Sequence, residues 1–368
     1  MRVKLALSAL CENPGRRTGL STLFPEFVAH ARRLFPDVSW LVFAGRDAPW
    51  PGSDACVEVC RDFASNERPL RRLLDDHLKV APEARRRGAA ALLTVGFFPL
   101  RPAGLPVAMH VFTVNHLRAG GGLRSVYRSR AVALGLERAA LVIANSAWTR
   151  DQLGPAAAPV IVSPEGIRHD VFKPEGPAGA PGIGGRYLLW ASNYYRYKRF
   201  ELVLAAYAGL QPAVRSEFPL VAVGGDWDGG LARAKAEAAR LGVAADVRFL
   251  GWVGDDELPA LYRGACAHVL STSEETFGRS VLEAMACGCL NVVQDLPVLR
   301  EVAGGTALYV DFADTAAASR VLEQACAGAA GRAQLTAAGV ERSLAFSFER
   351  VARERVGAIL SRIGAPQP

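Results

Sequence analysis

The sequence predicts an α/β protein built from two successive doubly wound domains, each a parallel sheet with helices on both faces. Short, continuous apolar runs alternate with helical segments along most of the chain, which is typical of strands buried on both faces. The chain has 368 residues, more than one ordinary core holds. A single Gly- and Pro-rich stretch without periodicity, 176–185, interrupts the alternation near the middle, and we expect the domain boundary there.

The first predicted domain covers residues 1–175 and opens with the alternating segment 3–10, which fits a strand better than a signal peptide. Its further strands are expected at 40–45, 56–60, 91–96, 107–114, 140–145 and 160–166. Helices are expected between them, for example at 125–139 and 146–154.

The second predicted domain covers residues 186–345, and a last helix occupies 346–368. Its strands are expected at 186–192, 220–225, 246–251, 267–272, 290–295 and 307–311. Ligands of doubly wound sheets bind outside the carboxyl ends of the strands. Two such domains are therefore expected to bind ligands in a cleft between them.

Composition excludes several classes of protein. Half of the residues are hydrophobic and 21% are charged, so the chain can bury sizeable cores and is not disordered. It has no apolar run of the 18 or more residues that a membrane-spanning helix requires. Its seven cysteines lack the paired spacing of a zinc site, which favours reduced thiols in a cytosolic protein.

Charge is distributed unevenly along the chain. Residues 1–173 hold 24 Lys and Arg against 15 Asp and Glu, a net +9, and the remainder, 19 against 21, has −2. Basic residues cluster at 30–35, 68–79 and 83–88. These runs either form a solvated face or meet an anionic partner: a membrane surface, a lipid diphosphate or a nucleic acid. Nucleic acid is disfavoured, because no binding module or aromatic–basic interleaving appears.

Residues 271–288, STSEETFGRSVLEAMACG, join the end of a predicted strand to the start of a helix and carry Glu275 and Glu283. Glu283 lies one turn into the helix, where its carboxylate can accept two hydrogen bonds from a ribose diol. Gly278 lets the backbone approach a ligand closely. The first-turn N–H groups form an anion site suited to a diphosphate, with donors from Phe277, Gly278, Arg279 and Ser280. The alternative is a helix cap with a solvent-facing acid.

Residues 275–288 resemble the acid-x7-acid motif of retaining GT-B glycosyltransferases, in the group 1 family that includes sucrose synthases and bacterial mannosyltransferases. The match includes Phe-Gly after the first acid and Glu-Ala-Met-Ala-Cys-Gly at the second. Four further segments resemble the same family: 141–153, 162–174, 221–226 and 247–265.

The resemblance implies the GT-B fold, with two Rossmann-like domains facing a cleft and the last helix crossing back to the first domain. It also implies roles for individual positions. Glu283 would hold the nucleotide ribose, and Glu275 would contact hydroxyls of the transferred sugar. The backbone of 277–280 would lie at the diphosphate and sugar, and the backbone around Val253 would pair with the nucleobase.

The family also places a basic pair after the strand at 186–192, where it neutralises the donor diphosphate and the growing charge of the leaving group. Lys198 matches the family lysine, and Tyr197-Lys198-Arg199 resembles a mannosyltransferase-like subset. Asn193 stands where the family has an arginine. Arg196 or Arg199 therefore supplies the second charge, or Lys198 acts nearly alone; the alternative is a basic surface loop.

In the first domain the resemblance points to two loops. Gly15 and Gly19 do not form the dinucleotide fingerprint, but Gly19 matches a glycine that approaches the donor phosphate and sugar. The family commonly has a sugar-contacting histidine where this chain has Asn115, and His116 follows. Either side chain would make that contact.

Together these features predict retaining transfer of a hexose, mannose being the guess, from a nucleotide-diphosphate sugar to a glycan or lipid-linked acceptor. The donor would bind residues 186–330 and the acceptor the N-terminal half. No cofactor is expected, and no metal, because no Asp-x-Asp follows a strand. We expect a cytoplasmic protein that acts in cell-surface polysaccharide or glycolipid synthesis. The basic N-terminal half could also bind it peripherally to an anionic membrane.

Two rivals remain at this stage. One is a non-catalytic GT-B subunit that binds nucleotide sugars or scaffolds a synthase, which the replacements at Asn193 and Asn115 favour. The other is a GT-B epimerase, which lacks this motif, or a phosphorylase, which is ordinarily far longer. The sequence does not identify the sugar, the base, the acceptor or the oligomeric state.

Overall fold

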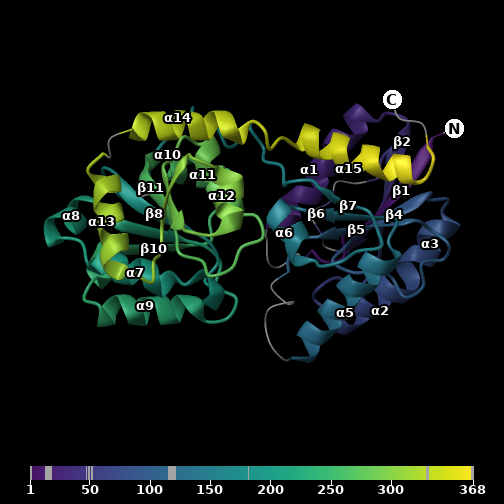
Figure 1. The fold of residues 1–368 in the computed structure, drawn as a ribbon, viewed down its shortest axis with the longest axis horizontal. Helices are drawn as coiled ribbons and strands as arrows, with labels where there is room; N and C mark the ends of the chain where they lie inside the picture. Colours follow the sequence, from purple (N-terminus) through teal and green to yellow (C-terminus); the bar gives the residue numbers. More distant parts are fainter. Residues whose placement is uncertain are drawn as a thin grey trace. The chain divides into compact units, whose positions relative to one another are not determined.

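The computed structural model describes residues 2–12, 19–46, 48, 50, 53–114, 122–180, 182–328 and 331–365. The chain divides into two compact units (Figure 1). Unit 1 consists of Met1–Gly166 and Phe348–Pro368, and unit 2 of Ile167–Ser347.

Unit 1 contains a seven-stranded parallel sheet in the order β3-β2-β1-β4-β5-β6-β7. All seven strands predicted for this half are present. Their bounds are β1 Val3–Ser8, β2 Val38–Gly45, β3 Val57–Phe63, β4 Ala91–Val95, β5 Val107–Val111, β6 Leu141–Ala144 and β7 Val160–Val162.

Helices cover both faces of this sheet. In Figure 1, α1 and α15 lie on one face, and α2, α3 and α5 on the other. The helical elements are α1 Gly19–Leu34, α2 Pro69–Leu74, the π-helix η1 Asp75–Lys79, α3 Val80–Arg86, α5 Leu123–Arg138, α6 Ala147–Gln152 and α15 Phe348–Arg362.

The closing helix α15 is part of the core of unit 1. Its apolar side chains, Val356 among them, are buried in one cluster with those of α1 and β1. Arg355 is almost fully buried and donates hydrogen bonds to the carbonyl oxygens of Ser163, at 3.0 Å, and Pro164, at 2.9 Å. Unit 1 is therefore discontinuous in sequence, since its core needs residues from both ends of the chain.

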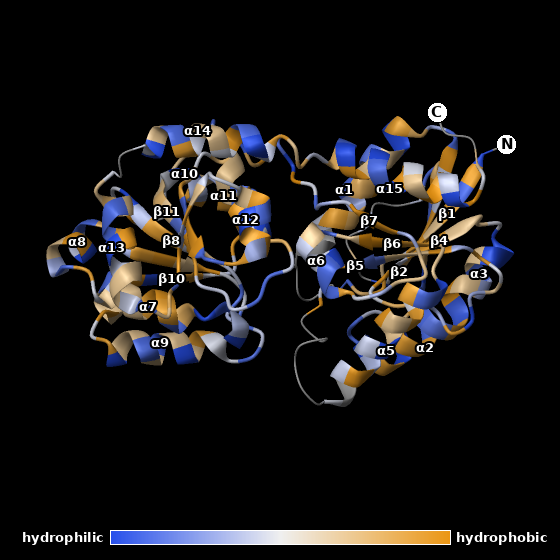
Figure 2. Ribbon diagram, in the orientation of Figure 1, coloured by the Kyte–Doolittle hydropathy of each residue, from blue (hydrophilic) through white to orange (hydrophobic). Residues whose placement is uncertain are grey.

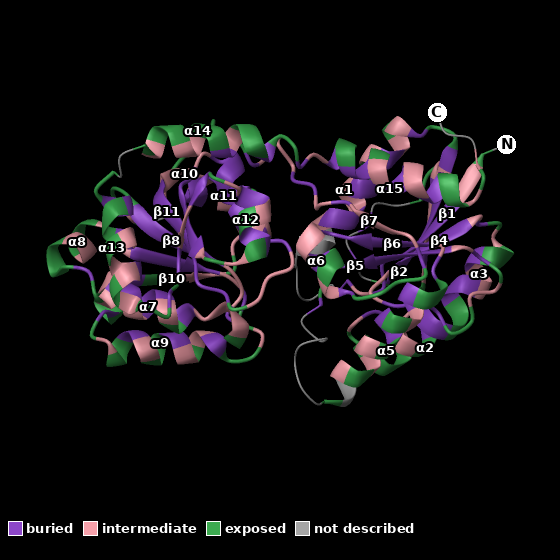
Figure 3. Ribbon diagram, in the orientation of Figure 1, coloured by how far each residue is buried: buried purple, intermediate pink, exposed green. Residues whose placement is uncertain are grey.

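Unit 2 contains a six-stranded parallel sheet in the order β10-β9-β8-β11-β12-β13. All six strands predicted for this half are present. β8, β9 and β11 are buried throughout, whereas β10, β12 and β13 are buried only in part (Figures 2 and 3). Their bounds are β8 Tyr187–Ala191, β9 Leu220–Val223, β10 Val247–Gly251, β11 Ala265–Leu270, β12 Asn291–Gln294 and β13 Ala307–Val310.

The sheet of unit 2 is also flanked by helices. These are α7 Phe200–Ala208, α8 Pro212–Glu217, α9 Gly230–Arg240, α10 Leu258–Gly264, α11 Arg279–Ala286, α12 Pro297–Ala303, α13 Thr315–Cys326 and α14 Arg332–Ser343, with the 3-10 turns η2 Arg196–Lys198 and η3 Ala244–Asp246.

The boundary between the units differs from the expected one at 176–185, because it follows Gly166. Ile167 and Phe172 are buried in a core cluster of unit 2. Arg263 of α10 donates to the carbonyl oxygens of Lys173, at 3.0 Å, and Pro177, at 2.6 Å. The segment that leads into the Gly- and Pro-rich stretch is thus already fastened to unit 2.

Within the described residues, no helix combines the length and apolar character needed to cross a membrane. All seven cysteines are free thiols, and five of them are buried.

Candidate functional site

The candidate site in unit 2 lies at the carboxyl ends of two neighbouring strands. β8 pairs with β11 in parallel, so the loops that follow these strands emerge at the same edge of the sheet. The loop after β8 forms η2, and the loop after β11 leads into α11. Most of the predicted site residues of this half lie on these two loops and on the first turns of α11.

Hydrogen bonds fasten the two loops to each other. The Ser271 hydroxyl donates to the carbonyl oxygens of Lys198, at 3.1 Å, and Arg199, at 2.7 Å. The backbone N–H of Ser273 donates to the Tyr197 carbonyl oxygen at 2.8 Å, and the Thr272 hydroxyl to the same oxygen at 3.2 Å. The polar run that follows β11 therefore fixes the backbone that carries Lys198.

Lys198 and Glu275, 77 positions apart in sequence, form an ion pair between the Nζ and Oε1 atoms. Their side chains are only 14% and 13% exposed. The Lys198 ammonium also lies 5.3 Å from the centre of the Tyr197 ring. Burial, with a smaller contribution from the Glu275 charge, raises the pKa of the Tyr197 phenol. The structure thus joins two of the predicted catalytic residues in one sheltered charge pair.

The helix α11 begins as the sequence suggests, with a glycine at its N-cap. Gly278 has φ 97° and ψ 51°, a left-handed conformation that glycine adopts without steric cost. A Cβ atom at this position would come within 2.5 Å of the Leu299 side chain. The buried Phe277 ring packs edge-on against Phe346, with ring centres 5.8 Å apart. These contacts fix the approach to the helix, so a larger residue cannot replace Gly278 without movement of its neighbours.

The first turn of α11 provides anion-binding character. The Gly278 carbonyl oxygen accepts hydrogen bonds from the N–H groups of Val281, at 3.0 Å, and Leu282, at 3.2 Å. The N–H groups of Arg279 and Ser280 come before these first intrahelical bonds, at the end of the helix where backbone N–H groups point outward. Such groups, together with the helix dipole, favour a negatively charged ligand.

Glu283 is held on α11 by donors from two directions. It is 8% exposed, and its Oε2 accepts a hydrogen bond from the Tyr262 hydroxyl at 3.1 Å. Its Oε1 accepts from the Arg279 guanidinium at 3.1 Å. Burial raises the pKa of Glu283, and Arg279 and Tyr262 oppose that shift by stabilising the carboxylate.

Tyr262, on α10, is a residue that the sequence reasoning missed. It is fully buried, and burial raises the pKa of its phenol well above the ordinary value, so the hydroxyl stays protonated and donates to Glu283. In the sequence, its position within the apolar run LPALY is indistinguishable from that of a core aromatic residue. Only the fold reveals that α10 directs its hydroxyl toward the motif.

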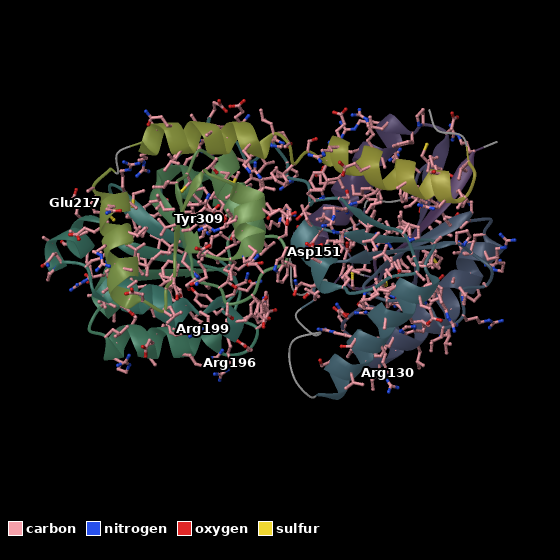
Figure 4. The ribbon with its side chains drawn as sticks, viewed as in Figure 1. Arg130, Asp151, Arg196, Arg199, Glu217 and Tyr309 are labelled. Carbon is pink, nitrogen blue, oxygen red and sulfur yellow. The ribbon has the colours of Figure 1, made fainter. Side chains whose placement is uncertain are left out.

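The three other predicted site residues on the loop after β8, Asn193, Arg196 and Arg199, make different contacts. The Asn193 side-chain oxygen accepts a hydrogen bond from the Gly225 N–H at 2.9 Å, so it ties this loop to the one after β9. Arg199 has a left-handed conformation, with φ 52°, and donates to Glu201 at 2.6 Å. Arg196 is exposed and has no ion-pair partner among the described residues (both arginines are labelled in Figure 4). Neither arginine joins the Lys198–Glu275 pair.

The predicted nucleobase position, Val253, follows β10. It is half-buried and packs against a core cluster of unit 2, whereas the preceding Trp252 is 48% exposed. The Gly251 carbonyl oxygen, at the end of β10, accepts a hydrogen bond from the Gly224 N–H at 2.8 Å. The loops after β8, β9 and β10 are thus linked in series.

The predicted residues of unit 1 are less informative. Gly19 is the first residue of α1. Asn115 and His116 lie outside the described residues.

Among the residues that the structure describes, no three His, Cys, Asp or Glu side chains come together as a metal site would require. Fixed positive charge at the candidate site comes from Lys198, from Arg279 and from the N-terminus of α11.

Comparison with known proteins agrees with this geometry. Residues 182–342 match the family described as glycosyl transferases group 1. The O-antigen chain mannosyltransferase B of Escherichia coli is 29% identical over 244 residues, which are 63% of this chain and 63% of that protein. The chain thus spans somewhat less than two thirds of the length of this curated relative.

Solved structures resemble the chain over nearly its whole length. Sucrose-phosphate synthase from Thermosynechococcus elongatus superposes with a TM-score of 0.78 at 19% identity, covering 99% of each chain. HepE of Anabaena, in complex with UDP and glucose, gives a TM-score of 0.74 at 18% identity over 98% of this chain and 100% of that one. The predicted GT-B fold is confirmed by these similarities.

Proposed function

Because residues 182–342 match the family of group 1 glycosyl transferases, we propose that the chain is a retaining hexosyltransferase that uses a nucleotide-diphosphate sugar. The observation that carries this proposal is the Lys198–Glu275 pair beside the N-terminus of α11. A lysine and a helix N-terminus at one place can bind a diphosphate, and the neighbouring carboxylate can accept hydrogen bonds from a sugar.

Each donor group has a proposed contact. Glu283 accepts hydrogen bonds from the ribose diol, whose hydroxyls replace Arg279 at Oε1 while the Tyr262 hydroxyl stays bonded to Oε2. The N–H groups of the first turn of α11 and the Lys198 ammonium bind the diphosphate. The nucleobase lies against the backbone around Val253. UDP and glucose bound to the similar HepE support a nucleotide-sugar donor.

We propose that transfer occurs by attack of the acceptor hydroxyl on the face from which the nucleotide leaves. The bond from the sugar C1 to the diphosphate oxygen breaks, the acceptor oxygen bonds to C1, and the leaving phosphate oxygen takes the acceptor proton. Lys198 stabilises the negative charge that grows on the diphosphate. The pairing of Glu275 with Lys198 favours a positioning role for this carboxylate over attack on C1.

The acceptor is proposed to be a glycan or a lipid-linked sugar that binds to unit 1, at the inner face of the cell membrane. The name of the mannosyltransferase relative supports a mannose-like hexose and a role in surface-polysaccharide synthesis. The test is a panel of nucleotide sugars scored by thermal unfolding. The true donor at a hundred times its dissociation constant should add about 2.7 kcal/mol of stability, and the same donor should release nucleoside diphosphate slowly without acceptor. A panel without any stabilising member would contradict the proposal.

The transfer is proposed to be independent of metal, with Lys198 and α11 in the electrostatic role that a cation fills elsewhere. Turnover should then be unchanged in excess EDTA. Complete loss with EDTA, restored by manganese or magnesium, would exclude this part of the proposal.

The competing candidate is a non-catalytic subunit that binds a nucleotide sugar or scaffolds a synthase. Asn193 favours it, because it stands where the family resemblance implies an arginine and its side chain accepts a hydrogen bond from Gly225 instead. Donor hydrolysis separates the two: a scaffold would be stabilised by the donor but would release no nucleoside diphosphate.

A further inference from the structure

The segment 68–79 of unit 1, RPLRRLLDDHLK, is folded with its acids inside and its leucines outside. Asp75, Asp76 and His77 of η1 are buried, with 2%, 1% and 7% of their surfaces exposed. Leu70, Leu74 and Leu78, at intervals of four residues, are 79%, 57% and 41% exposed. This is the reverse of the arrangement that burial of apolar surface favours.

The orientation of this segment is fixed by the partners of its buried acids. Asp76 accepts hydrogen bonds from the Ser8 hydroxyl at 2.7 Å and from Arg72 at 2.9 Å. Asp75 accepts from the Ala64 N–H at 2.9 Å and from Lys79 at 2.7 Å. Rotation of the helix to bury the leucines would carry Asp76 away from Ser8 and Asp75 away from the Ala64 N–H, the two donors that belong to other elements. The exposure of the leucines is therefore a built feature of the fold.

Two neighbouring elements enlarge the apolar surface. The Tyr127 hydroxyl of α5 lies against the His77 ring, and the Arg101 N–H donates to the His77 carbonyl oxygen at 3.0 Å. Val126 and Leu100, next to these residues in sequence, are 48% and 67% exposed. Five of the seven large hydrophobic side chains exposed among the described residues thus belong to this segment or stand next in sequence to residues that contact it. We call this set the leucine patch: Leu70, Leu74, Leu78, Leu100 and Val126.

Two of the elements that carry the leucine patch also carry exposed cations. Arg68 and Arg71 of the α2 segment and Arg128 and Arg130 of α5 are exposed (Arg130 is labelled in Figure 4), and none has an ion-pair partner among the described residues. By sequence, unit 1 carries 26 Lys and Arg against 16 Asp and Glu, a net charge of +10. Exposed apolar side chains with exposed arginines on the same elements match the interface of an anionic lipid bilayer, where the leucines enter the headgroup region and the arginines meet lipid phosphates.

A second copy of the chain is a poorer occupant. A twofold interface through the leucine patch would bring the same patch of each copy together. Arg68, Arg71, Arg128 and Arg130 of one copy would then lie near those of the other, and like charges would oppose association.

We propose that the leucine patch and its flanking arginines form a docking surface for an anionic membrane. This goes beyond the transfer reaction and holds whether or not that activity is found, because it rests on residues of unit 1 that the candidate site does not use. It also explains the basic run at 68–79, for which the sequence left a solvated face and an anionic partner as alternatives.

The test is sedimentation of the full chain with vesicles of phosphatidylcholine alone or mixed with phosphatidylglycerol, at low and high salt. The wild type should bind only the mixed vesicles, and less at high salt, because the charge attraction is screened over about 10 Å at 0.1 M salt. Leu70→Ser with Leu74→Ser should weaken binding by about tenfold or more for each leucine. Arg68→Glu with Arg71→Glu should weaken it by at least about fivefold for each arginine.

Matched control variants show whether the loss of any exposed leucine, or of any two arginines, weakens vesicle binding. Leu344→Ser removes a leucine of unit 2 that is 60% exposed. Arg320→Glu with Arg362→Glu lowers the net charge as much as the arginine pair does, on α13 and α15. These controls should bind vesicles like the wild type. Equal binding by the patch variants and the wild type, or no binding by the wild type, would overturn the proposal. Dimerisation of the wild type that the leucine variant abolishes, without vesicle binding, would assign the patch to a second copy instead.

Discussion

The two units share one architecture, a parallel sheet flanked by helices, but differ in net charge and in how their charged side chains are paired. Unit 2, with 17 Lys and Arg against 20 Asp and Glu, has a net charge of −3, while unit 1 has +10. At the candidate site of unit 2, sheltered cations are paired with carboxylates, Lys198 with Glu275 and Arg279 with Glu283. On the elements of the leucine patch in unit 1, four arginines are exposed and have no ion-pair partner in the part of the chain that the structure describes. This difference supports the two proposals, a small charged ligand that exchanges for internal partners in unit 2 and an extended anionic surface for unit 1.

The buried glutamates of the two units sharpen this contrast. Glu283 has a donor at each carboxylate oxygen. Glu12 of unit 1 is 1% exposed, accepts one hydrogen bond from Trp50 Nε1 at 3.0 Å, and has no partner for Oε1 among the described residues. Burial raises the pKa of Glu12 to about 8. Two glutamates buried to a similar degree thus differ in how well their charged forms are stabilised.

The largest expected effect is that of Lys198→Ala on turnover. If this lysine stabilises the leaving diphosphate, its loss should lower kcat by about a hundredfold or more. Arg199→Ala is the matched control, because that arginine pairs with Glu201 and should change kcat little. Steady-state kinetics with the donor found in the panel measure both. Wild-type turnover in Lys198→Ala would transfer the role to Arg196, the exposed cation on the same loop.

The position of Lys198 beside Glu275 shows what the sequence could predict. The acid-x7-acid motif and the strand pattern pointed to each residue separately. Their ion pair depends on the adjacency of β8 and β11, strands that enclose two others in sequence, and no local pattern encodes that order. Likewise the boundary at Gly166 depends on which core receives Ile167 and Phe172.

The second expected effect concerns Glu283→Gln. If the carboxylate binds the ribose diol, this variant should weaken binding of every nucleoside diphosphate by about tenfold or more, since hydrogen bonds to a charged group contribute about 1.5–3 kcal/mol. Isothermal titration with nucleotides that lack a sugar isolates this contact. Glu301→Gln, a change of the same chemistry on α12, should leave affinity unchanged. Unaltered affinity in Glu283→Gln would remove the ribose assignment.

The third expected effect tests the contrasting glutamate of unit 1. The pKa of Glu12 is raised from 4.5 to about 8 in the folded chain, so the folded state binds the extra proton between these values. The contribution of Glu12 to the free energy of unfolding should therefore be fully present below pH 4.5. It should fall as the pH rises from 4.5 to 8, by up to about 1.4 kcal/mol per pH unit. Glu12→Gln should flatten that part of the pH dependence, as measured by urea unfolding at pH 5, 6, 7 and 8. An unchanged slope would show that Glu12 is ionised throughout.

The inverted segment 68–79 marks the other limit of sequence reasoning. Leucines every four residues ordinarily predict the buried face of a helix. Here the short π-helix η1 places Asp75, Asp76 and His77 inward, where Ser8, Arg72 and Ala64 supply donors. The partners that decide the orientation come from β1 and from the loop after β3, so the outcome is a property of the folded unit.

The smallest expected effect belongs to Tyr262→Phe. The substitution keeps the ring and deletes one hydrogen bond to Glu283, which should weaken nucleotide binding by about fivefold, for a bond of about 1 kcal/mol. If Tyr262 had only a structural role, no further effect on nucleotide binding would be expected. A positioning role has a second consequence: without the phenol the pKa of Glu283 rises further, so the pH above which nucleotide binds well should move upward. Tyr207→Phe, a buried tyrosine of α7 whose hydroxyl donates to the carbonyl oxygens of Arg215 and Phe218, controls for the loss of a buried hydroxyl. Nucleotide affinity measured from pH 5 to 8 for the wild type and both variants tests this role. If the pH profile of Tyr262→Phe overlays those of the wild type and Tyr207→Phe, Glu283 is positioned by Arg279 alone.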